Sequence, residues 1–164
     1  MLLNAAVKHK SHAALRVVQS QTPKQIIDKH FASFSELGKQ IAAAVPNARA
    51  VIDGEICSLD RRGKPQFKNL MFRRGNPPCF FAFDLLTCNG KDLRTEHLMD
   101  RKQELRRLLA KTSPPFPLRY AEHVERSGTA LFQRVCELDL EGVVAKQKFG
   151  PYVTERRTAL GTRF

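Results

Sequence analysis

Apolar residues along the chain recur at two different periods, which predicts a mixture of helices and strands. Helical spacing marks residues 33–45, where the apolar positions are Phe34, Leu37, Ile41 and Val45. Residues 97–111 predict an amphipathic helix, with Leu98, Leu105, Leu108 and Leu109 on one side and basic residues on the other. Residues 23–31 follow a Thr22-Pro23 start signal, and residues 128–139 follow a Ser127 cap and carry a core stripe of Leu131, Val135 and Leu138.

Strand patterns alternate with these helices, but not regularly. Residues 49–60 predict a strand, followed by an Arg-Arg-Gly-Lys turn and a return strand through residues 65–67. Residues 68–78 predict a helical turn and then a loop. The almost wholly apolar residues 79–88 predict a strand covered on both faces, ended by an Asn-Gly turn. Residues 118–125 and 140–146 complete the set, and the irregular order favours an α+β domain.

Length and composition fit one domain with its own core, because 42% of the 164 residues are hydrophobic. No run approaches the roughly 18 apolar residues of a membrane span, and the start is too soon charged for a signal peptide, so we expect a soluble, cytoplasmic protein. The histidines His9 and His12 have no second pair of ligand residues nearby, so we do not expect them to bind a metal ion. Four scattered cysteines favour buried free thiols over a metal site or disulfides: Cys57, Cys79, Cys88 and Cys136.

The formal net charge is +12, and the basic residues come in clusters. These clusters occupy residues 61–64, 68–74, 101–111 and 156–157. A polyanion such as nucleic acid is the simplest physical use of this surplus, because each phosphate contact releases a condensed counterion. A solvated basic surface explains the composition equally well, and charge alone does not separate the two.

Three predicted strands place a carboxylate inside an apolar run, namely Glu55, Asp84 and Glu141. A carboxylate in a packed region is costly unless it is paired, hydrogen-bonded or bound to a cation. Gly54 and Gly142 adjoin the two glutamates and would let another backbone or a ligand approach closely. Two such glutamates suit a magnesium ion bridged to substrate phosphates. Taken singly, each is more often a salt-bridged structural carboxylate.

Three segments, in this order, carry a specific resemblance: "AVIDGEICSLDRRGKPQF", "FFAFDLLTCNGKDLR" with "HLMDRKQELRRLL", and "CELDLEGVVAKQKFGPY". Together they closely resemble the adenylation domain of ATP-dependent DNA ligases of the bacterial end-joining type, over residues 31–157. The resemblance implies a nucleotidyltransferase fold, with two main antiparallel sheets flanked by helices and an ATP pocket between the sheets. It also implies ATP with Mg²⁺ or Mn²⁺, nicked or broken double-stranded DNA, other end-joining repair proteins as partners, and a place in the bacterial cytosol or nucleoid.

The resemblance implies roles for three residues. Glu55 would lie beside the ribose and the metal, Phe83 would stack on adenine, and Glu141 would hold the metal over the phosphates. Strict alternation groups Phe83 with Phe81 and Leu85 on one strand face, so a plain core aromatic also suits its position. The same alternation puts Lys146 opposite Glu141, and we assign that lysine no catalytic role.

The chain departs from the family pattern at both ends. The family's reaction begins with a lysine amine attacking the α-phosphate of ATP, but no Lys-x-Asp-Gly motif is present, and Gln21 stands where an arginine is expected. The Trp-x-Lys-x-Lys strand is also missing, so we predict no catalytic lysine and no complete ligation by this chain alone.

This pattern predicts residues 1–21 as a remnant, residues 22–158 as a partial adenylation domain truncated at both ends, and residues 159–164 as a divergent tail. Two alternatives stay open: a non-catalytic DNA-binding remnant, and a nucleotidyltransferase of the RNA ligase or capping type.

Overall fold

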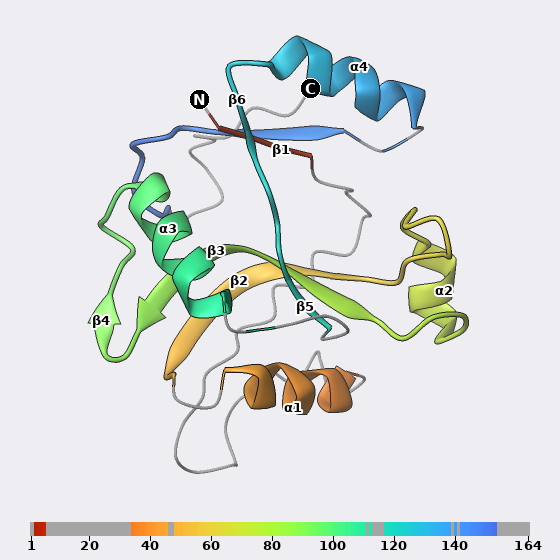
Figure 1. The fold of residues 1–164 in the computed structure, drawn as a ribbon, viewed down its shortest axis with the longest axis horizontal. Coiled ribbons are helices and arrows are strands. Elements are labelled where there is room, and N and C mark those ends of the chain that lie inside the picture. The colour runs from red at the N-terminus through yellow and green to blue at the C-terminus, as the bar shows by residue number, and fades with distance from the viewer. Residues whose placement is uncertain are drawn as a thin grey trace.

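A computed structural model shows two β-sheets lying one above the other, with helices around them (Figure 1). It describes residues 34–45, 48–110, 112, 117–138, 140 and 142–153, and the backbone of residues 2–5. The larger sheet has the order β2-β3-β4, with β5 also paired to β3. The smaller sheet has the order β6-β1-β7. The α+β class is therefore confirmed, as is the expectation of two sheets flanked by helices.

The larger sheet is built on two long antiparallel strands, β2 (Ala50–Cys57) and β3 (Cys79–Cys88). Both were predicted, and β3 has the bounds that its apolar run indicated. The pairing contains two register shifts, so Asp53 lies opposite Asp84 while Gly54 lies opposite Ala82. Phe83 is therefore an extra residue in β3, a β-bulge that breaks the strict alternation expected from the sequence.

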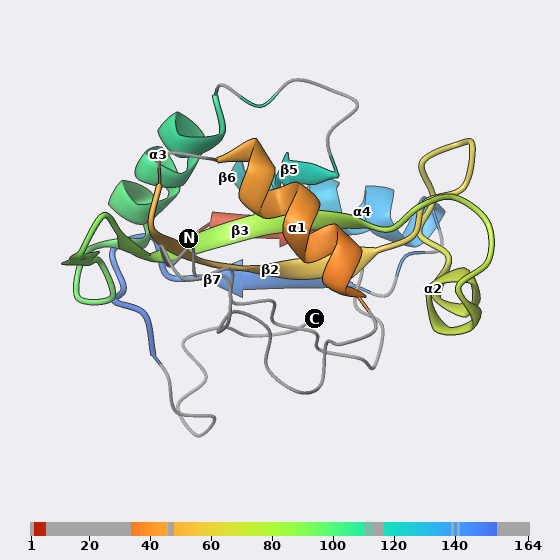
Figure 2. The ribbon, with the colours of Figure 1, turned by 90° about the horizontal axis from the view of Figure 1, so that it is seen from below.

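The main core lies on one face of the larger sheet, under α1 (Ser35–Ala44) (Figure 2). Leu37 and Ile41 of this predicted helix are buried against the sheet residues Ile52 and Phe80. Packing is close enough that a Cβ atom on Gly54 would clash with the Phe80 ring and the Phe81 carbonyl oxygen. Gly54 thus allows the neighbouring strand to come close, which is one of the two alternatives expected from its position, another backbone or a ligand.

The helix α3 (Leu98–Leu109) packs beside β3 and β5 and confirms the predicted amphipathic helix. Leu98, Leu105 and Leu109 are buried as expected. Its basic residues do not all face solvent, because Arg101 and Lys102 are also buried. These two cations lie in the interior, so they do not contribute to the basic surface that the sequence predicted.

The predicted single strand over residues 118–125 is wrong, because the segment divides between the two sheets. The strand β5 (Leu118–Tyr120) runs parallel to β3, whereas β6 (Val124–Glu125) pairs with β1 (Leu2–Ala5) in the smaller sheet. The residues between them carry the chain from one sheet to the other (Figure 1). A continuous sequence pattern gives no sign of this change of partner.

The smaller sheet is completed by β7 (Val143–Lys146) and covered by α4 (Gly128–Glu137). Val135 of α4 packs on Val143 and Ala145. One expectation for this helix is wrong, because Leu138 is 44% exposed instead of core. Ser127 lies at the N-cap position as predicted, but its side chain makes no capping hydrogen bond. Leu131 is partly buried against the same cluster.

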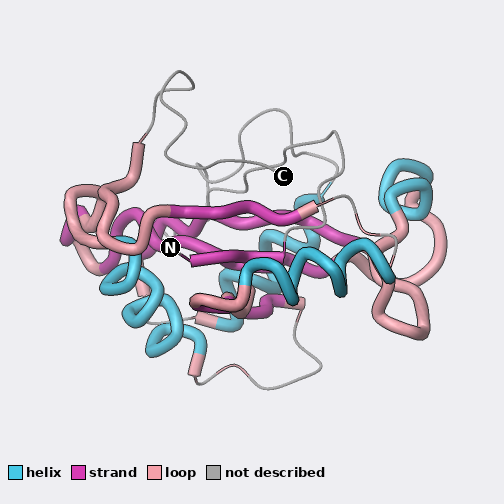
Figure 3. The backbone as a smooth tube through the Cα atoms, turned by 90° about the horizontal axis from the view of Figure 1, so that it is seen from above, coloured by secondary structure: helices cyan, strands magenta, loops and turns pink. Residues whose placement is uncertain are grey.

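Residues 59–78 form a projection from the larger sheet. An isolated bridge joins Leu59 and Pro65, and the predicted return strand ends there because α2 (Phe67–Phe72) begins. Figure 3 shows α2 and α3 at opposite ends of the molecule. At the far end of β3, the predicted Asn89-Gly90 turn leads into β4 (Lys91–Asp92), and both turn residues have positive φ.

Several expectations concern residues that lie outside the described ranges. The helix over residues 23–31 and the histidines His9 and His12 are among them. All four cysteines are free as predicted, but only Cys57 and Cys79 are buried, and Cys136 is exposed. Within the described ranges, no helix has the length and apolar character needed to cross a bilayer.

Candidate functional site

Phe83 lies at the point where the two sheets face each other. The β-bulge in β3 presents its half-buried ring to the smaller sheet, and the ammonium of Lys146 in β7 lies over that ring, 4.6 Å from its centroid. The carbonyl oxygen of Phe83 accepts a hydrogen bond of 3.2 Å from Lys102 Nζ. The ring therefore lies against a cation from a strand more than 60 residues further along the chain, away from the main core.

Lys146 is one of the site residues that the sequence alone did not identify. In β7, Val143 and Ala145 are buried against α4, so Val144 and Lys146 lie on the opposite face, toward the larger sheet. The two-residue alternation in "VVAK" contains this information. It becomes useful only when the fold shows which face of β7 is covered by a helix.

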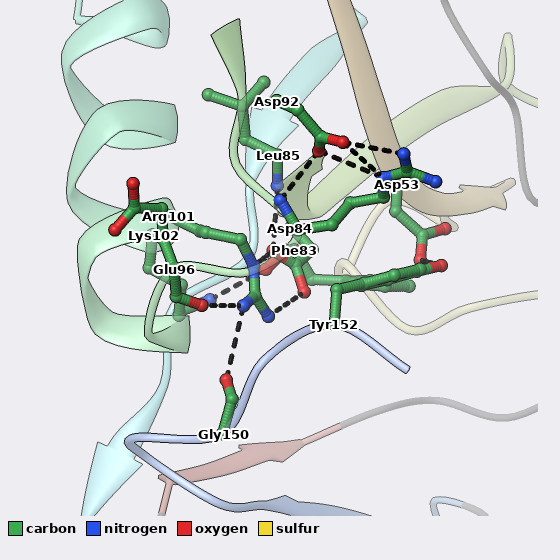
Figure 4. Close-up of polar contacts among 11 residues, drawn as sticks. Asp53, Phe83, Asp84, Leu85, Asp92, Glu96, Arg101, Lys102, Gly150 and Tyr152 are labelled. Carbon is green, nitrogen blue, oxygen red and sulfur yellow. Dashed lines mark hydrogen bonds and ion pairs between the residues drawn. The ribbon is translucent and has the colours of Figure 1, made fainter. Parts of the chain in front are cut away.

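Asp53 in β2 lies near the same lysine. The Tyr152 hydroxyl donates a hydrogen bond of 2.9 Å to Asp53 Oδ2 (Figure 4). Burial raises the pKa of the Asp53 carboxyl above its usual value, while the Tyr152 hydrogen bond and the Lys146 charge act in the opposite direction. The site thus contains a partly desolvated carboxylate held by two groups from the C-terminal part of the described chain.

Lys102 supplies a second ammonium behind Phe83. Its Nζ donates to the carbonyl oxygens of Phe83 and Ala121, both at 3.2 Å, and lies 4.8 Å from the centroid of the Tyr120 ring. Burial lowers the pKa of Lys102 to about 8, and the charge of Lys146 adds to the effect. The two lysines therefore influence each other electrostatically across the space between the sheets.

Arg101 holds the elements of the site together (Figure 4). Its guanidinium makes two hydrogen bonds to the Asp84 carboxylate, at 2.8 and 3.0 Å, and further bonds to the carbonyl oxygens of Glu96 and Gly150. It also lies over the Tyr152 ring, 5.8 Å from the centroid. Of the three carboxylates that interrupt apolar strands, Asp84 therefore has the structural, salt-bridged role.

Only one of the two remaining carboxylates lies among the described residues. Glu55 is half-buried opposite Phe81 and shares the half-buried face of β2 with Asp53, whereas Glu141 lies outside the described residues. Burial and the nearby Glu55 charge raise the pKa of the Cys57 thiol to about 12. Among the residues that are described, no three metal-ligating side chains gather into a cluster.

Glu55 alone fits a magnesium ion that takes most of its ligands from phosphates and water, but not a closed site made wholly of protein groups. The donor is a hard carboxylate oxygen, which is the type of ligand that this ion prefers.

A separate surface hollow of about 330 Å³ lies between α1, α2 and the loop at residues 73–78. Its lining includes Leu37, Asn69, Leu70 and Pro78, but none of Asp53, Phe83 and Lys146. The hollow and the site between the sheets are therefore different places on the molecule.

A family model described as the ATP-dependent DNA ligase domain matches residues 16–160. This chain belongs to that family. The multifunctional non-homologous end joining protein LigD of Pseudomonas aeruginosa is 33% identical to this member over 112 residues, which cover 66% of this chain and 13% of the relative. The corresponding DNA repair protein LigD of Mycobacterium tuberculosis is 32% identical over 136 residues, which cover 76% of this chain and 17% of the relative.

Solved structures of ligase domains show the same fold. The ligase domain of M. tuberculosis LigD aligns with a TM-score of 0.68 at 31% identity, over 80% of this chain and 42% of that chain. A mycobacterial DNA ligase D complexed with ATP and MES aligns with a TM-score of 0.70, also at 31% identity and with the same coverage. The nucleotidyltransferase fold implied by the resemblance is thus confirmed, and the chain spans less than half of each of these structures.

Proposed function

We propose that this chain binds ATP between its two sheets and forms the nucleotide-binding part of a DNA ligase adenylation domain. The observation that carries the proposal is the meeting of Phe83 from β3 with Lys146 from β7, which joins an aromatic ring to a cation at the sheet interface. An ATP ligand contains the two matching groups, a flat base and a polyanionic phosphate chain. The solved ligase D complexed with ATP supports this choice of ligand.

Each side chain has a role in this proposal. Adenine stacks on the Phe83 ring, a contact worth about 1–3 kcal/mol. The Lys146 ammonium attracts the phosphates, and Lys102 adds positive charge behind it. Tyr152 fixes Asp53, so the carboxylate is kept at a defined distance from the incoming phosphates. Arg101 acts only by positioning Tyr152 and β3.

For the divalent metal we propose Glu55 and Glu141 as protein ligands, with Mg²⁺ or Mn²⁺ as the ion. When bound, such an ion neutralises phosphate charge and orients the phosphates for transfer. Glu55 supports this role because it lies on the half-buried face of β2 that also carries Asp53. Glu141 is proposed from its motif alone.

The proposed substrate of the complete reaction is nicked or broken double-stranded DNA. The LigD relatives named for non-homologous end joining support this choice. On the same ground we propose other end-joining repair proteins as partners and the bacterial cytosol or nucleoid as the location. The 164 residues contain no Lys-x-Asp-Gly motif, so we propose that the chain binds ATP without forming a covalent lysyl-AMP. The wording "FDLLTCNGKDLR" fits DNA ligases better than RNA ligases or capping enzymes.

Titration calorimetry, which measures the equilibrium binding of ATP in the presence of Mg²⁺, tests the proposal. We expect saturable binding by the wild type and roughly a five- to 150-fold loss for Phe83→Ala, which removes the stacking energy. Phe81→Ala is the matched control, because Phe81 lies in the same strand, is also half-buried and also has a cation over its ring. Equal binding by the wild type and Phe83→Ala would show that the nucleotide does not stack there.

A further inference from the structure

The side chain of Lys102 in α3 is buried, and no carboxylate among the described residues lies within ion-pair distance of it. The residue is 1% exposed, and its Nζ donates hydrogen bonds of 3.2 Å to the carbonyl oxygens of Phe83 and Ala121. A buried ammonium is costly unless an opposite charge pairs with it. The described part of the chain therefore leaves the charge of Lys102 without a direct counter-charge.

Two acids act on Lys102 from a distance, but arginines bind both of them. The Asp84 carboxylate accepts hydrogen bonds of 2.8 and 3.0 Å from Arg101. Glu122 Oε1 accepts a hydrogen bond of 2.7 Å from Arg106. The charges of Asp84 and Glu122 raise the pKa of Lys102 less than burial lowers it. An anion that binds from outside is thus the missing counter-charge.

The groups that surround Lys102 come from several elements of the fold. Those that are charged or titratable are Arg106 of α3, Asp84 of β3, Tyr120 of β5, Glu122 and His123 of the segment after β5, and Lys146 of β7. Burial lowers the pKa of Lys102 to about 8, and the like charge of Lys146 is the next cause. Neutralising the charge of Lys146 would therefore move the pKa of Lys102 back toward its ordinary 10.5.

The hydrogen bonds of Lys102 also fix the backbone at two points beside the proposed nucleotide site. Phe83 is the extra residue of the β3 bulge, and Lys102 Nζ holds its carbonyl oxygen (Figure 4). Ala121 lies where the chain leaves β5 for the smaller sheet, and its N–H donates to the Ala82 carbonyl oxygen at 2.7 Å. One ammonium thus ties the bulge to the start of the crossing between the sheets.

We propose that Lys102 is a positioning residue for the nucleotide, which holds the Phe83 bulge in place for stacking and takes up a proton when the phosphates bind at Lys146. The inference rests on the proposed function, because ATP supplies the anion. A neutral Lys102 amine keeps two N–H donors for its two carbonyl oxygens, and its free electron pair accepts the proton from solvent. Both hydrogen bonds are therefore kept while the charge changes.

Titration calorimetry of the full 164-residue chain with ATP and Mg²⁺, in buffers of different ionisation enthalpy, counts the protons taken up. At pH 8 we expect about half a proton per ATP, because half of Lys102 is neutral before binding. The affinity for ATP should fall roughly five- to tenfold between pH 7 and pH 9. Adenosine has no phosphates and should bind without proton uptake. His123 does not contribute at pH 8, because burial keeps its pKa below the ordinary 6.5.

Three variants separate the proton from the positioning role. Lys102→Arg keeps the charge and the donors but cannot release a proton, so it should bind ATP nearly as tightly as the wild type and take up no proton. Lys102→Met loses both hydrogen bonds to the backbone and should weaken adenosine binding several-fold, a loss that Lys102→Arg restores. Lys148→Met is the control, because Lys148 already pairs with Glu125 at 2.7 Å, and its proton uptake should equal that of the wild type.

Two results with the variants would overturn the proposal. Proton uptake that persists in Lys102→Arg would assign the proton to another group, and unchanged adenosine affinity in Lys102→Met would remove the positioning role. ATP binding by the wild type without proton uptake would contradict this inference alone, whereas absence of ATP binding would contradict the proposed function as well.

If Lys102→Arg does not fold, NMR titration of the wild-type Lys102 side chain gives the same information. The midpoint of its titration should move to higher pH when ATP is added, and an unchanged midpoint would overturn the proposal.

Discussion

Arg101 of α3 and Asp84 of β3 form a buried ion pair through two parallel hydrogen bonds of 2.8 and 3.0 Å, with side chains that are 2% and 1% exposed. The same guanidinium binds the Gly150 carbonyl oxygen and lies over Tyr152. One cation therefore connects the larger sheet, the helix beside it and the segment that follows β7. Because Tyr152 in turn holds Asp53, this pair determines the shape of the proposed nucleotide site.

Replacing Arg101 by methionine should destabilise the fold by about 3–5 kcal/mol, because Asp84 is then left charged and unpaired in the interior. Urea unfolding measures the change. Arg94→Met is the control, because it removes a similar bidentate pair with Asp92 that is exposed to solvent, and we expect a small effect there. The double variant Arg101→Met/Asp84→Leu should recover much of the loss. A double variant as unstable as the single one would show that packing, rather than the lone charge, is responsible.

Lys102 should make stability depend on pH in the alkaline range. Its pKa in the folded protein is about 8, below the ordinary 10.5, so the unfolded chain binds more protons between these values. The buried charge of Lys102 lowers the free energy of unfolding. This loss disappears as pH rises from about 8 to 10.5, so the free energy of unfolding increases over that range by up to roughly 3 kcal/mol. The difference in unfolding free energy between wild type and Lys102→Met isolates this residue. A difference that stays constant across the range would contradict the burial of its charge.

Lys146 should contribute to binding of the phosphates but not of the base. We expect Lys146→Met to weaken ATP binding roughly tenfold or more, because a charge-assisted interaction with phosphate is removed, and to leave adenosine binding almost unchanged. Lys148→Met is the matched control, since Lys148 already pairs with Glu125 at 2.7 Å. Calorimetric titrations with the two ligands give the comparison. An equal loss of affinity for ATP and adenosine would assign Lys146 to the shape of the site instead of its charge.

The chain should not label itself with AMP. Without a Lys-x-Asp-Gly motif, none of its lysines is predicted to act as the nucleophile that forms the phosphoramidate. Incubation with ATP radiolabelled at the α-phosphate and Mg²⁺, followed by denaturing gel electrophoresis, is the measurement. A labelled band that survives denaturation would show that one of the lysines present acts as the nucleophile. Lys146 would be the first candidate.

The sequence predicted those elements whose patterns are local. The apolar run of β3, the stripe of α3 and the Asn89-Gly90 turn were each expected where they occur, because strand length, helical period and turn chemistry are set by neighbouring residues. The bulge at Phe83 and the division of residues 118–125 between two sheets were not predicted. Both depend on pairing with distant strands, which no local pattern records.

The site was predicted in part for the same reason. Phe83 was singled out by its motif, and the fold places it at the sheet interface. Lys102 looked like part of a basic surface because its helix is amphipathic, yet two carbonyl oxygens satisfy it in the interior. Lys146 and Tyr152 were not assigned, because their roles depend on which face of β7 is covered and on where the chain goes afterwards. The roles given to Glu55 and Glu141 stay predictions.

Photo-crosslinking with 8-azidoadenosine triphosphate reports where the base lies, and so it tests binding of the nucleotide between the sheets without an intermediate step. After irradiation and digestion, mass spectrometry should find the label on peptides from β3 around Phe83 or from β7 around Lys146, and excess ATP should suppress it. Label on the lining of the hollow between α1 and α2, for example at Leu70 or Pro78, would contradict this placement and move the nucleotide to another part of the molecule.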